Sequence, residues 1–125
     1  MAKNNGYASL VKQRAEGKTK RRKLDDYETP VDKTGYLFDH FPFKAKAILE
    51  PASGSGRMAD VIKSRGFKVT TADIKRGADF TRRTARFAGA IVTNPPYRDG
   101  LADAFVNKAL QLADGEVAML MEAKF

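Results

Sequence analysis

The fold is decided by one stretch of the sequence, Lys46-Ala47-Ile48-Leu49-Glu50-Pro51-Ala52-Ser53-Gly54-Ser55-Gly56. The apolar run near its start predicts a short buried strand, and the small residues after Pro51 predict a turn. Residues 57–65 carry apolar side chains on one side and predict a helix that Gly66 ends. A strand, a glycine-rich turn and a helix in this order are typical of nucleotide-binding units of several kinds.

Strand and helix patterns alternate on both sides of this stretch. Apolar runs predict further strands at residues 67–72, 89–93 and 117–121, and spaced apolar residues predict helices at 31–41 and 101–113. The polar segment between the second and third predicted strands matches no element clearly. Strands that are apolar throughout and alternate with helices predict an α/β domain with a mainly parallel sheet, covered by helices on both faces.

Composition excludes several classes of function. The chain of 125 residues suits one domain, predicted at residues 27–125. It has no cysteine and one histidine, His40, which excludes a disulfide, a thiol nucleophile and a multi-histidine metal site within one chain. We expect a structural role for His40, which lies in an apolar stretch. Without an apolar run of about 18 residues or a signal-peptide pattern, we expect no membrane span and a cytoplasmic protein.

The positive charge is concentrated at the start of the chain. Residues 1–24 hold eight of the 23 Lys and Arg residues and one acid, Glu16, so they carry +7 of the net +8. Few large apolar side chains occur in residues 1–26, which predicts a basic, disordered tail. Such a tail is attracted to the phosphates of nucleic acid, although a solvated tail that aids solubility explains the charge equally well.

Two glycines and two acids predict a cofactor site. Gly54 and Gly56 allow positive φ and let a ligand approach the backbone closely. Asp73 ends the next predicted strand, where a carboxylate can accept both hydroxyls of a ribose. Glu50, at the tip of the first strand, would repel a pyrophosphate but attract the cationic methionine end of S-adenosylmethionine. The set fits a dinucleotide or S-adenosylmethionine, and Glu50 favours the second.

The tetrapeptide Asn94-Pro95-Pro96-Tyr97 predicts chemistry on an amino nitrogen. It follows an apolar strand, at the sheet edge where ligands bind. Its two prolines fix two φ angles and remove two N–H donors, which makes a rigid corner that presents carbonyl oxygens. The side-chain oxygen of Asn94 and the carbonyl of Pro95 can hold the two hydrogens of an amino group such as adenine N6. Tyr97 can stack on a flat substrate.

With these motifs the sequence resembles the class I S-adenosylmethionine-dependent methyltransferases, in particular the DNA adenine N6 type. The resemblance covers residues 27–125. Residues 48–56 are similar to the family's first motif, an acid and a proline followed by two spaced glycines, and Asn94-Pro95-Pro96-Tyr97 matches the catalytic motif of amino-methyltransferases. The pairs Thr29-Pro30 and Asp79-Phe80 resemble less specific motifs of the family.

The resemblance implies a Rossmann-like, doubly wound sheet of order 3-2-1-4-5 with S-adenosyl-L-methionine as cofactor. In the family, the counterparts of Asp73 hold ribose, those of Asp79-Phe80 contact adenine, and those of Thr29-Pro30 close over the methionine moiety. The implied cofactor-binding residues are Thr29, Pro30, Glu50, Ala52, Gly54, Gly56, Asp73, Ile74, Asp79, Phe80 and Asn94. The implied catalytic residues are Asn94, Pro95, Pro96 and Tyr97.

The sequence departs from the family after its last predicted strand. Family members usually continue with two more strands and a return helix, whereas this chain stops at Phe125 and has no room for a target-recognition domain. We expect a truncated or split enzyme of phage or bacterial type, with DNA as its partner. The alternatives are the same chemistry on an RNA base, cytosine N4 or a glutamine amide, and an inactive cofactor-binding or nucleic-acid-binding remnant. The sequence does not define the oligomeric state.

Overall fold

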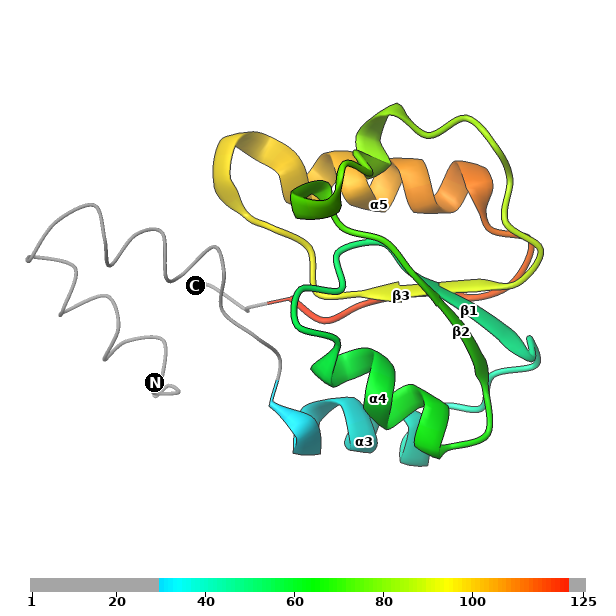
Figure 1. Ribbon diagram of the computed structural model, residues 1–125. Helices are drawn as coiled ribbons and strands as arrows, with labels where there is room; N and C mark the ends of the chain where they lie inside the picture. The colour runs from blue at the N-terminus through cyan, green and yellow to red at the C-terminus, as the bar shows by residue number, and fades with distance from the viewer. Residues whose placement is uncertain (1–29, 122–125) are drawn as a thin grey trace, which may run out of the picture.

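Four short strands form a parallel sheet at the centre of the chain, in a computed structural model that describes residues 30–121 (Figure 1). The strands are β1 (Ala47–Glu50), β2 (Lys68–Thr71), β3 (Ala90–Thr93) and β4 (Val117–Met119), and their order in the sheet is β2-β1-β3-β4. All three pairings are parallel, with Ile48 opposite Val69 and Ile91 opposite Val117. The carboxyl ends of the strands therefore meet along one edge of the sheet.

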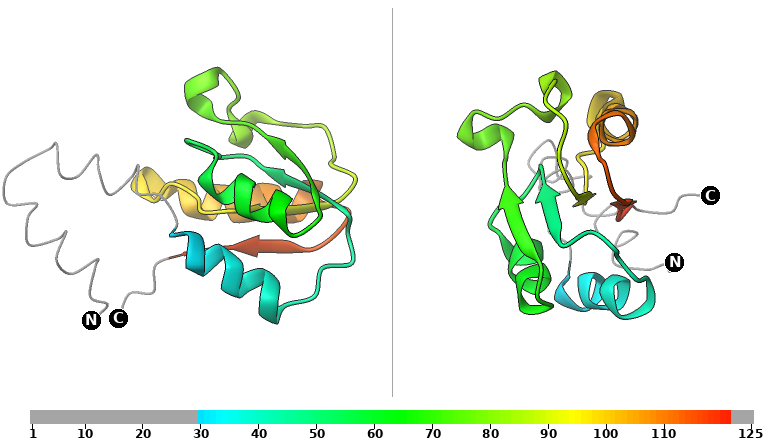
Figure 2. Two further views of the ribbon diagram at one scale, coloured as in Figure 1. Left: turned by 60° about the horizontal axis from the view of Figure 1, so that its bottom comes forward. Right: turned by 90° about the vertical axis from the view of Figure 1, so that its right-hand side faces the viewer.

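Helices cover both faces of this sheet (Figures 1 and 2). Helices α3 (Val31–His40) and α4 (Arg57–Ser64) lie on one face and α5 (Leu101–Leu112) lies on the other. Adjacent residues of a strand point to opposite faces, so Ile48 packs in the cluster under α4 while Leu49 packs in the cluster under α5. Both side chains are at most 1% exposed, which is why β1 is apolar at consecutive positions.

The predicted α/β class and the parallel sheet with helices on both faces are confirmed. The predicted order 3-2-1-4-5 includes a strand between the segments that form β2 and β3. That prediction is wrong, because the described residues form no strand there. In its place lie two 3₁₀ helices, η2 (Ile74–Arg76) and η3 (Phe80–Arg82). The carboxylates of Asp73 and Asp79 accept backbone N–H groups at the starts of these helices, so local turns satisfy the backbone there in place of a strand ladder.

His40 is exposed at the end of α3, and its structural role stays a prediction. Its ring stacks on Tyr36 with the centroids 4.0 Å apart, and its Nδ1 lies 2.9 Å from the Tyr36 carbonyl oxygen. Between residues 30 and 121, no helix combines the length and the apolar character needed to cross a bilayer. The predicted basic tail, residues 1–26, lies outside the described residues.

Candidate functional site

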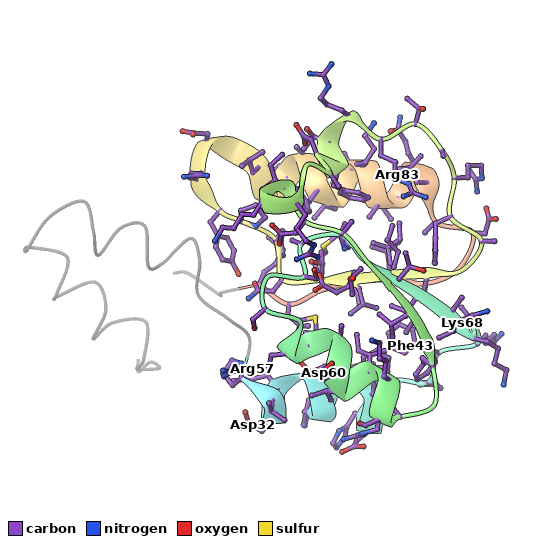
Figure 3. The ribbon with its side chains drawn as sticks, viewed as in Figure 1. Asp32, Phe43, Arg57, Asp60, Lys68 and Arg83 are labelled. Atoms are coloured by element: carbon purple, nitrogen blue, oxygen red, sulfur yellow. The ribbon has the colours of Figure 1, made fainter. Side chains whose placement is uncertain are left out.

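A pocket of about 530 Å³ opens where strands β1, β2 and β3 end. Its walls come from the glycine turn after β1, the η2 and η3 segment after β2, the turn after β3 and the start of α5. Arg57, at the start of α4, is one of the residues that line the pocket. Figure 3 shows Arg57 at the end of the molecule opposite to Lys68, the first residue of β2. The predicted site residues that line the pocket are Glu50, Ala52, Gly54, Asp73, Ile74, Asp79, Phe80, Asn94 and Pro96.

The glycine turn needs both of its glycines for backbone conformation. Gly54 has φ +54° and Gly56 has φ +92°, and Gly56 precedes the first residue of α4. A Cβ atom added at either position would meet no heavy atom within 4 Å. The predicted positive φ is therefore present, and backbone strain rather than crowding excludes most other residues here.

The N–H groups of this turn are largely used within the protein. The Ser53 N–H donates to the Ala72 carbonyl at 3.0 Å, and the Gly56 N–H donates to the Ser53 carbonyl at 2.8 Å. The N–H groups of Ala52 and Gly54 donate to the carboxylates of Glu50 and Asp73. A phosphate-binding loop presents such N–H groups to its ligand. This turn is thus poorly suited to hold a pyrophosphate.

Glu50 places a buried carboxyl group in the wall of the pocket. Its side chain is 1% exposed, and its Oε2 accepts hydrogen bonds from the Ala52 N–H at 3.2 Å and from the Thr93 hydroxyl. Burial raises the pKa of Glu50 from 4.5 to about 7, against the opposing effect of these hydrogen bonds. A positive charge close to this carboxyl would favour its ionised form and would in turn be bound more tightly.

Asp73 connects the end of β2 to the glycine turn. It is 7% exposed, its Oδ2 accepts the Gly54 N–H at 2.7 Å, and its Oδ1 accepts the Lys75 N–H at 2.9 Å. Each carboxylate oxygen has room for a second hydrogen bond, so a ribose hydroxyl can still be accepted. Asp73 therefore has a structural role that the sequence did not reveal, and its role toward a ligand stays a prediction.

The sequence analysis missed Arg76, which approaches the glycine turn from η2. Its Nη2 donates to the Ser53 hydroxyl at 2.5 Å and its Nη1 donates to the Gly54 carbonyl at 3.3 Å. Both backbone polar groups of Gly54 are thus hydrogen-bonded: Asp73 accepts its N–H, and Arg76 donates to its carbonyl oxygen. The only sequence signal for this pairing was the position of Arg76 three residues after a predicted ligand-binding acid.

The turn after β3 brings Asn94 and Pro96 to the pocket wall. The hydroxyl of Tyr97 donates to the Asn94 side-chain oxygen at 3.1 Å and lies 3.4 Å from the Leu120 carbonyl oxygen. Tyr97 is 38% exposed, so the residue is accessible from solvent.

The structure does not bring every predicted site residue to the pocket. Gly56, Pro95 and Tyr97 are outside its lining, and Pro30 lies at the start of α3, also outside the lining. Thr29 lies outside the described residues. Phe80 lines the pocket but is also a core residue, 5% exposed, with its ring 5.0 Å from that of Phe105. Its contact with adenine stays a prediction.

Comparisons with known proteins add no relative. No protein-family model matches the chain, and neither characterised proteins nor solved structures give a match. Among residues 30–121, no group of three or more His, Cys, Asp or Glu side chains could hold a metal ion. The function is therefore inferred from the residues of the pocket themselves.

Proposed function

We propose that this chain is the S-adenosylmethionine-binding core of a Rossmann-like, class I methyltransferase that acts on an exocyclic amino nitrogen. Adenine N6 in DNA is the first candidate substrate. One observation carries the proposal: Glu50, Asp73 and Asn94, from the ends of three different strands, line the same pocket. Its volume of about 530 Å³ lies within the range of pockets that enclose a ligand of this size.

The electrostatics of the pocket support S-adenosylmethionine over a dinucleotide. A pyrophosphate would face Glu50 and a turn in which the N–H groups of Ala52, Ser53, Gly54 and Gly56 already have acceptors. The sulfonium and ammonium groups of S-adenosylmethionine carry positive charge, which suits a buried carboxyl whose pKa is raised to about 7. Asp73, at the end of β2, has acceptor capacity left for the hydroxyls of the ribose.

Asn94 supports transfer to an amino group. When bound, S-adenosylmethionine supplies an electrophilic methyl group. The amino nitrogen of a base is a poor nucleophile, and an acceptor that holds one of its hydrogens orients the lone pair toward that methyl group. Asn94 lines the pocket, and its side chain carries the amide oxygen that this contact requires; the Tyr97 hydroxyl, which donates to that oxygen at 3.1 Å, helps to orient it.

The proposal is tested by transfer of a labelled methyl group. The full chain is incubated with labelled S-adenosylmethionine and, in parallel, with adenine-containing DNA, adenine-free DNA, RNA and a protein mixture. We expect label in DNA as N6-methyladenine. Label in RNA, in cytosine N4 or in a glutamine amide would retain the reaction class and change the substrate. Cofactor binding without transfer to any of them would favour the cofactor-binding remnant, and absence of both would contradict the proposal.

A further inference from the structure

Arg76 is placed to control the shape of the glycine turn. It lines the pocket from η2, and its guanidinium bridges two acceptors of the turn, the Ser53 hydroxyl and the Gly54 carbonyl. Ser53 is 7% exposed, so its hydroxyl has little access to water as an alternative partner. A planar guanidinium can serve two acceptors at once, which an ammonium group does less well.

The glycine turn needs hydrogen bonds of this kind to keep one backbone conformation. It contains glycines at positions 54 and 56, and glycine gains more conformational freedom than other residues when it is not held. No Cβ atom at these positions packs against neighbouring atoms, so hydrogen bonds rather than packing must fix the peptide orientation. Asp73 holds the N–H of Gly54 at 2.7 Å, and Arg76 holds its carbonyl at 3.3 Å.

We propose that Arg76 is a positioning residue that, together with Asp73, holds the glycine turn in its ligand-binding shape before the ligand arrives. The identity of the ligand, S-adenosylmethionine, rests on the proposed function. The positioning of the turn by Arg76 and Asp73 does not. A turn that is already ordered loses less conformational entropy on binding, so Arg76 raises the affinity for the ligand without a direct bond to it.

The first test uses the ligand-free protein and amide hydrogen exchange at Gly54. The variant is Arg76→Gln, and the matched control is Arg82→Gln, which removes the same charge from the neighbouring η3 outside the pocket lining. We expect exchange at Gly54 to accelerate about tenfold in Arg76→Gln and to stay unchanged in Arg82→Gln. Equal exchange in the two variants would overturn the proposal.

Ser53→Ala provides a second variant that removes one acceptor and leaves Arg76 in place. Because both substitutions break the same bond, exchange at Gly54 in the double variant should match that of Arg76→Gln alone. Effects that multiply independently would contradict the bridge between Arg76 and Ser53. This comparison of the double variant with Arg76→Gln tests the hydrogen bond between Arg76 and Ser53 even if Arg76→Gln lowers the overall stability.

The second test measures affinity for S-adenosylmethionine by calorimetry. Arg76→Gln should weaken binding about tenfold through the cost of ordering the turn, and Arg82→Gln should leave the affinity unchanged. If the natural chain does not bind S-adenosylmethionine, the proposed function fails while the exchange result still decides the role of Arg76. Unchanged affinity in Arg76→Gln, in a chain that binds the cofactor, would remove Arg76 from the site.

Discussion

Glu50 carries a carboxyl group whose pKa burial raises from 4.5 to about 7, so that both its protonated and its ionised forms are populated near neutral pH. A raised folded-state pKa means that the folded protein binds more protons between these two values than the unfolded chain does. Its contribution to stability is therefore complete below pH 4.5, falls as pH rises to about 7, and is lost above it. The shift corresponds to about 3 kcal/mol.

Glu50→Gln removes this titration and keeps the side-chain shape. We expect the natural chain to lose about 2–3 kcal/mol of unfolding free energy relative to Glu50→Gln between pH 4.5 and 8. Urea unfolding of both proteins across this range gives the difference, with Asp60→Asn on the exposed side of α4 as the control. A difference that does not depend on pH would show that Glu50 is already ionised in the free protein.

Asn94 and Tyr97 should differ in what they contribute to turnover. Asn94→Ala removes an acceptor aimed at the substrate amine and should lower turnover about a hundredfold, with little change in cofactor affinity. Tyr97→Ala should weaken substrate binding by about 1–3 kcal/mol through lost stacking. Tyr97→Phe keeps the ring but loses the 3.1 Å bond to Asn94, so a fall in turnover of about fivefold is expected without loss of substrate affinity.

Steady-state methyl transfer with the active substrate separates these effects, and Asp99→Asn is the control. Asp99 has φ +54°, a conformation that asparagine also adopts, and it does not line the pocket. Full turnover in Asn94→Ala would mean that the turn after β3 is a corner of the fold and no part of a catalytic site.

At the scale of elements, the glycine turn between β1 and α4 depends on its backbone. Gly56→Ala places an alanine at φ +92° with no steric contact within 4 Å, so the loss of stability should reflect strain alone, about 1–2 kcal/mol. Gly56→Asn should lose less, because asparagine tolerates positive φ better. Urea unfolding measures both. Equal stability of Gly56→Ala and the natural chain would show that the turn relaxes to negative φ.

The elements differ in how far the sequence alone predicts them. Strands β1 and β3 were predicted to within one residue at each end, because both faces of each strand are covered and every side chain is apolar or buried. The segment after β2 was not, because the side chains of Asp73 and Asp79 order it through local hydrogen bonds without any repeating apolar pattern.

The candidate site shows the same division. Its glycines, Asp73 and the turn after β3 have sequence signals, because their residue types are required by backbone geometry or by chemistry. Arg76 has no sequence signal that backbone geometry or chemistry would require. Its partners Ser53 and Gly54 lie 23 and 22 residues earlier in the chain. That contact exists only because β1 and β2 are neighbours in the sheet, so their following turns meet.

At the scale of the whole molecule, the net charge of +8 is carried almost entirely by residues 1–24. If these residues contact DNA phosphates, their removal should reduce the salt dependence of DNA binding, by a slope of about 0.9 for each phosphate no longer neutralised. Titrations of the full chain and of the chain without residues 1–24, at several salt concentrations, measure the two slopes. Equal slopes would assign the phosphate contacts to the folded domain.

The central claim, a pocket built for S-adenosylmethionine, is tested most directly by calorimetric titration of the full chain. The account predicts saturable binding of S-adenosylmethionine at one site, much weaker binding of a dinucleotide because of Glu50 and the occupied turn, and proton release near pH 7 as Glu50 ionises. Asp73→Ala, checked to be folded, should weaken this binding by about 1.5–3 kcal/mol. Absence of S-adenosylmethionine binding, or tighter binding of the dinucleotide, would contradict the account.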